Sequence, residues 1–140
     1  MSDNKLNEIA QVLFPRGISR SGLLRLGACD RVDVDRGRVI AEAGGRVDCV
    51  FVVLRGYVDV GRRRCGPGDV LGDAAALVHA PWEQSAVVAR EARLLVIPAQ
   101  RFASLLEDVP EFNAVVMRAL SARLLTAERQ VSAPRVALVN

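Results

Sequence analysis

Apolar residues follow a helical spacing at both ends of the chain and a strand-like spacing between them. Leu6, Ile9 and Leu13 share one face of a predicted helix over residues 3–14. Ser19 is placed to cap a second short helix. We therefore expect the chain to begin with a pair of helices.

From residue 31 the apolar residues form short runs separated by turns that contain glycine. Residues 49–54 read as a buried strand, and Arg55-Gly56 is expected to turn it into a second strand over residues 57–60. After the small residues 72–76, further strands are expected at 85–89 and 92–97. This spacing is typical of an antiparallel sandwich or barrel, and we expect a roll of eight strands or nearly so.

Two prolines mark the starts of two C-terminal helices, because proline is tolerated in the first turn of a helix. Pro98 begins the first, and Pro110 begins a longer helix to about residue 131. The apolar residues of the longer helix step by three or four, and they include Val116, Leu120 and Leu124. Packing within the chain would explain this stripe, but the helix length favours contact with a second copy, so we predict a homodimer.

The predicted fold class is α+β: an antiparallel, jelly-roll-like β-roll with an N-terminal helical pair and two C-terminal helices. At 140 residues the chain suffices for one core. We expect a single domain over residues 1–131 and a flexible tail over 132–140.

Composition narrows the possible functions. The net charge is only +3, and basic residues cluster only at Arg62-Arg63-Arg64, so we expect no DNA partner. The longest apolar run, residues 50–54, is too short to cross a membrane. Three cysteines without metal or disulfide spacing indicate reduced thiols in the cytoplasm. The single histidine, His79, has no catalytic or metal-binding partner nearby in the sequence, and we expect neither an enzyme, a metal nor a cofactor.

Five sequence features, in this order, resemble the cyclic nucleotide-binding domain family of catabolite-activator-type regulators, protein kinase A regulatory subunits and gated ion channels. They are the glycine turns of residues 37–44, the strand–Gly–strand segment 52–60, Gly66-Pro67-Gly68-Asp69, the phosphate-binding cassette of residues 70–77, and residues 94–102 with Pro98. The resemblance implies a β-roll that binds a cyclic nucleotide such as cAMP, or a related anion, and relays binding through its C-terminal helices.

The resemblance places ligand binding at the cassette. A glycine before a short helix lets backbone N–H groups converge on an anion, and Asp73 stands where the family has a glutamate that accepts a ribose hydroxyl. The candidate ligand-binding residues are Gly72, Asp73, Ala74, Gln84 and Ser85, with Trp82 as a candidate for base stacking. Packing at the edge of the core is the alternative role for Trp82.

One position departs from the family pattern. Gln84, preceded by Glu83, falls where the family has the arginine that neutralises the phosphate, and no arginine or lysine lies between Arg64 and Arg90. A buried phosphate without a counter-charge is costly, so we expect weak or absent cAMP binding. A degenerate relative that serves as a protein-interaction scaffold is the alternative. A transcription regulator is less favoured, because its helix-turn-helix would follow residue 140. The sequence does not identify a protein partner.

Overall fold

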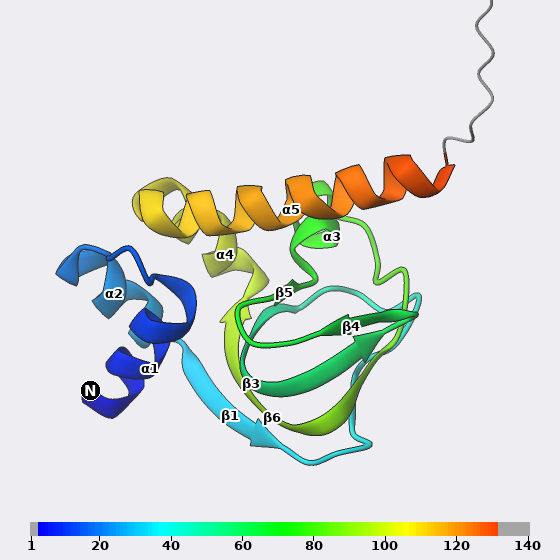
Figure 1. The fold of residues 1–140 in the computed structure, drawn as a ribbon, viewed down its shortest axis with the longest axis horizontal. Coiled ribbons are helices and arrows are strands. Elements are labelled where there is room, and N and C mark those ends of the chain that lie inside the picture. Colours follow the sequence, from blue (N-terminus) through cyan, green and yellow to red (C-terminus); the bar gives the residue numbers. More distant parts are fainter. Residues whose placement is uncertain (1–2, 132–140) are drawn as a thin grey trace, which may run out of the picture.

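The computed structural model describes residues 3–131 as an antiparallel β-roll with helices at both ends (Figure 1). Helices α1 (Asp3–Leu13) and α2 (Arg20–Gly27) precede the sheet, and α4 (Ala99–Asp108) and α5 (Pro110–Val131) follow it. The short helix α3 (Asp73–Val78) interrupts the strands. The strands are β1 (Asp30–Val34), β2 (Val39–Ala41), β3 (Cys49–Val60), β4 (Arg63–Cys65), β5 (Val70–Leu71) and β6 (Ala86–Pro98). Within residues 3–131, no helix is long and apolar enough to cross a membrane.

The long strands β3 and β6 form the centre of the sheet. They pair antiparallel from Cys49 opposite Pro98 to Val60 opposite Ala86. The sheet order is β1-β6-β3-β4, while β2 pairs with β6 and β5 pairs with β3. The sheet curls without closing into a barrel (Figure 1). The predicted fold class is confirmed, with six strands in the described part of the chain rather than about eight.

Gly56 lies inside a continuous strand, so the predicted turn at Arg55-Gly56 is wrong. Its φ is +82°, and the register between β3 and β6 shifts on both sides of it. A β-bulge of this kind bends a strand without ending it. Residues 86–98 are likewise one strand, β6, where two strands were expected.

The core has two clusters because β3 sends alternate side chains to opposite faces of the sheet. Val50 and Val52 belong to the cluster beneath the helices, where Phe102 and Phe112 meet edge to face at a centroid distance of 6.0 Å. Val53 belongs to the second cluster, which fills the inside of the roll.

The first half of α5 is part of the core of its own chain. Val116 is fully buried, and Leu120 packs partly buried against the same cluster. This corrects the assignment of Val116 to a dimer contact: its face of the helix is used within the chain. Leu124, in contrast, is 60% exposed, and Met117 and Leu125 are also exposed. The second half of α5 continues across α3 (Figure 1).

The three cysteines are free thiols in desolvated surroundings. Burial raises the pKa of Cys29, Cys49 and Cys65, so each carries little thiolate at neutral pH. We expect slow alkylation of the native protein by iodoacetamide, with the half-buried Cys49 reacting first. Peptide mass spectrometry would measure this order, and unfolding in urea should make all three react fast. Rapid labelling of native Cys29 or Cys65 would contradict the prediction.

Candidate functional site

The turn from β5 into α3 carries the predicted cassette. Gly72 is the N-cap of α3 and has a φ of +86°. A Cβ at this position would lie 2.8 Å from Cη2 of Trp82, so a larger residue would be strained and crowded. Glycine therefore allows the cassette turn to lie directly against the indole ring.

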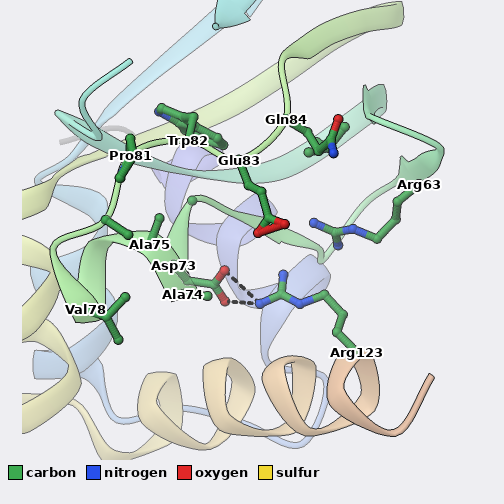
Figure 2. A pocket seen from close by; sticks show the side chains of 13 residues that line it. Arg63, Asp73, Ala74, Ala75, Val78, Pro81, Trp82, Glu83, Gln84 and Arg123 are labelled. Carbon is green, nitrogen blue, oxygen red and sulfur yellow. Dashed lines mark hydrogen bonds and ion pairs between the residues drawn. The ribbon is translucent and has the colours of Figure 1, made fainter. Parts of the chain in front are cut away.

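Among residues 3–131, Asp73 is the one charged residue that is buried, with an exposure of 1%. Its Oδ1 and Oδ2 accept hydrogen bonds from Nη2 of Arg123 at 2.8 and 2.7 Å (Figure 2). Nη1 of Arg123 donates to the backbone carbonyl of Val70 at 2.9 Å. The carboxylate that the sequence analysis assigns to a ribose hydroxyl is therefore bonded to helix α5.

A hollow of about 460 Å³ lies beside this ion pair, and we call it the first hollow. Its walls come from the end of β3, β4, α3, the segment before β6, and α5. Five of the predicted residues line it: Gly72, Asp73, Ala74, Trp82 and Gln84. Ser85 does not; its Oγ accepts a hydrogen bond from the backbone N–H of Ala43 at 3.0 Å.

Trp82 lies between the first hollow and the core. Its side chain belongs to the cluster inside the roll, and its ring lies 6.2 Å from that of Phe51 with a tilt of 33°. Its backbone N–H and carbonyl pair with Gly45 and Gly44. With 7% exposure, the residue has the packing role that was the alternative to base stacking, and stacking stays a prediction.

Two arginines that the sequence analysis did not assign line the first hollow. Arg63 comes from β4 and Arg123 from α5, and both point into the hollow near Glu83 and Gln84 (Figure 2). Arg63 stands in the one cluster of basic residues, which is a signal that could have drawn attention to it. Arg123 and Asp73 are 50 residues apart in the sequence, and no local sequence pattern predicts a contact between them.

The lining of the first hollow brings opposite charges together. Two guanidiniums face two carboxylates, and one pair of opposite charges, Asp73 with Arg123, is already made. Among residues 3–131 no group of three or more His, Cys, Asp or Glu side chains is placed to hold a metal ion. Guanidinium groups match the geometry of phosphate oxygens, but the two carboxylates balance their charge, so the lining carries no net positive charge.

Known proteins share this sequence pattern. A model of the family described as "Cyclic nucleotide-binding domain" matches residues 31–109, more than half of the chain. Patatin-like phospholipase domain-containing protein 7 of Mus musculus is 28% identical over an alignment of 116 positions, which covers 76% of this chain and 9% of that protein. The CRP-like cAMP-activated global transcriptional regulator of Mycobacterium tuberculosis is 27% identical over an alignment of 103 positions, which covers 66% of this chain and 46% of the regulator. The chain thus spans less than half the length of these relatives.

Solved structures share the fold. A cyclic nucleotide-binding domain from Methylobacillus flagellatus has a TM-score of 0.76 at 18% identity, covering 96% of this chain and 88% of that one. The catabolite activator protein of Thermus thermophilus has a TM-score of 0.67 at 21% identity, covering 82% of this chain and 59% of that one. The regulatory domain of Toxoplasma gondii PKA with cAMP also scores 0.67, at 15% identity, covering 75% of this chain and 46% of that one. At these identities the likeness concerns the fold alone.

Proposed function

The chain belongs to the cyclic nucleotide-binding domain family, and from this premise we propose that it is a cytoplasmic regulatory module rather than an enzyme. It binds a cyclic nucleotide or a related anion in the first hollow and relays binding to helix α5. The observation that best supports this proposal is the contact between Asp73 of the cassette and Arg123 of α5. This contact joins the cassette directly to the element that would carry the signal.

The Asp73 carboxylate limits how ligand and helix can bind together. Two carboxylate oxygens offer about four acceptor positions, of which Arg123 uses one on each oxygen. A ribose hydroxyl that donates to Asp73 must share the carboxylate with Arg123 or displace it. The two states are one with Arg123 bonded to Asp73 and one with Arg123 displaced, and a ligand favours whichever it binds more tightly. A ligand that displaces Arg123 would therefore weaken the attachment of α5 to the roll.

Hydrogen exchange tests this relay. We would measure binding of cAMP and cGMP by calorimetry and then compare amide exchange in α5 with and without saturating ligand. We expect faster exchange in the part of α5 around Arg123 when ligand is bound, while exchange in β3 is unchanged. Binding without any change in α5 would refute the relay but leave the binding function intact.

A protein-interaction scaffold without a ligand is the second candidate function. The Asp73–Arg123 contact is compatible with this candidate as well, because Arg123 already bonds to both carboxylate oxygens that a ligand would need. Gln84 also brings no charge to the first hollow. If neither cyclic nucleotide binds, the scaffold becomes the better proposal.

A gain of binding would test whether Gln84 limits the affinity. The double change Glu83→Ala with Gln84→Arg is expected to strengthen cAMP binding about ten- to a hundredfold, because a charge-assisted hydrogen bond contributes about 1.5–3 kcal/mol. Glu83→Ala alone is the control, since it removes repulsion without adding a donor. Calorimetry measures both variants. An unchanged affinity in the double variant would show that Gln84 does not limit cAMP binding, and no detectable binding in either protein would favour a hollow that is closed to nucleotides.

We also propose that α5 joins two copies of the chain. Met117, Leu124 and Leu125 are 41%, 60% and 52% exposed, and they lie seven and eight residues apart, on one side of the helix. The double change Leu124→Glu with Leu125→Glu should halve the mass measured by light scattering. Val78→Glu, at a 71% exposed position of α3, is the matched control and should leave the mass unchanged. A wild-type protein that is monomeric at high concentration would show that this proposal is wrong.

A further inference from the structure

Arg63 lies where two hollows meet. A second hollow of about 930 Å³ lies between the β3–β4 turn and α5. The residues that line both hollows are Val60, Arg63, Gln84 and Arg123. The second hollow adds polar groups of its own, from Arg62, Thr126 and Gln130. A group bound to Arg63 would therefore lie at the entrance to both spaces.

The Arg63 guanidinium has no bonded partner within residues 3–131, although the residue is half-buried. Its neighbours differ in this respect. Arg64 bonds to both carboxylate oxygens of Asp59 at 2.8 and 3.0 Å, and Arg123 bonds to Asp73 and to the Val70 carbonyl. Among the arginines that line the first hollow, Arg63 is thus the one whose donors are available to a ligand. Its side chain points toward Glu83 and Arg123 (Figure 2).

The backbone holds Arg63 in place. It pairs with Val60 across the short β3–β4 hairpin, so its main chain is fixed by the sheet. The same hairpin positions Gln84: a Cβ on Gly61 would lie 3.1 Å from the Gln84 amide group, which therefore packs against the turn. A cationic donor and a neutral donor are thus held side by side on the rim of the first hollow.

We propose that Arg63 binds a phosphodiester group of a nucleotide at the junction of the two hollows, and so replaces the arginine that the family carries at the position of Gln84. This inference rests on the proposed ligand-binding function and names the residue that supplies the counter-charge. A planar guanidinium can bind two phosphate oxygens at once, a geometry that a lysine cannot reproduce. The positive charge of Arg63 also offsets the carboxylate of Glu83 in the same hollow.

Calorimetry on the full chain tests the proposal with two probes, cAMP with one phosphodiester and cyclic di-GMP with two. We expect the wild type to bind at least one probe and Arg63→Gln to bind it at least tenfold more weakly. Arg36→Gln removes the same charge at an exposed turn that lines neither hollow, and this variant should bind the probe with an affinity within twofold of wild type. Weaker binding of cAMP by Arg63→Gln than by wild type would support a contact between Arg63 and the phosphodiester of a cyclic mononucleotide. Preferential binding of cyclic di-GMP would show that the ligand occupies both hollows.

The possible failures are distinguishable. If the wild type binds a probe and Arg63→Gln binds it equally well, the role of Arg63 is overturned while ligand binding stands. If the wild type binds neither probe, the proposed ligand-binding function fails, and the role of Arg63 with it. Circular dichroism would verify that each variant folds. Arg63→Lys keeps the charge and replaces Arg63→Gln in the test if the glutamine variant does not fold. If Arg63→Lys binds the probe as tightly as wild type, the contact of Arg63 with two phosphate oxygens is overturned.

Discussion

Replacing Gly56 by alanine is expected to lower the free energy of unfolding by about 3–5 kcal/mol. The residue has a φ of +82°, and a Cβ there would lie 2.1 Å from the carbonyl oxygen of Glu91 and 2.7 Å from the Cα of Ala92. Both atoms belong to the backbone of β6, so they cannot move without disturbing its pairing with β3. Since domains of this size are stable by only about 5–15 kcal/mol, urea unfolding should show a large shift of the midpoint.

Gly37 provides the matched control for this change. Its φ is +90°, but no atom lies within 4 Å of a Cβ built on it. Gly37→Ala therefore introduces backbone strain without a clash, and we expect a loss of only about 1–2 kcal/mol. Equal losses in the two variants would show that the close approach of β3 to β6 at Gly56 is not what requires glycine.

Replacing Arg123 by leucine is expected to cost about 3 kcal/mol, since it leaves the buried carboxylate of Asp73 without its partner. The expected value lies at the low end for buried pairs because the Arg123 side chain is 24% exposed. We further expect the second half of α5 to exchange its amide hydrogens faster. Urea unfolding measures the first effect and mass spectrometry of exchanged peptides the second.

Two further variants separate the ion pair from a general effect on the helix. Arg118→Leu changes an exposed arginine of the same helix and should cost less than about 0.5 kcal/mol. Adding Asp73→Asn to Arg123→Leu should recover part of the lost stability, because a neutral amide is less costly to bury than a charge. If Arg123→Leu behaves like Arg118→Leu, the ion pair does not hold α5 to the cassette.

The overall architecture is largely visible in the sequence because it depends on local signals. Ser19 caps α2 through its side-chain oxygen, which accepts a hydrogen bond from Gly22 at 3.1 Å, as its position predicts. Pro98 and Pro110 mark the starts of α4 and α5. The sequence does not distinguish the bulge at Gly56 from a turn, because glycine is common in both. Pairing with β6 decides between them, and no local pattern reveals that pairing.

Only part of the candidate site could be predicted, because contacts between distant segments leave no local sequence pattern. Gly72, Asp73 and Ala74 lie in one segment, and their spacing could be compared with a family pattern. Arg63 and Arg123 join them from other elements of the fold. The stripe of α5 shows a similar limit: helical spacing identifies Val116 and Leu124 as apolar contacts, but it cannot say that the first faces the core and the second does not.

The position of Arg123 in α5 has a thermodynamic consequence. Arg123, Leu124 and Leu125 are consecutive, so one turn of the helix carries both the bond to the cassette and the apolar surface that is exposed. If the proposed ligand binding and the proposed association at α5 are coupled through this turn, the coupling is reciprocal. If a ligand changes the association constant of α5 with a second molecule by some factor, that second molecule changes the ligand affinity of the first hollow by the same factor. A ligand titration repeated at rising protein concentration would therefore report the strength of the contact at α5.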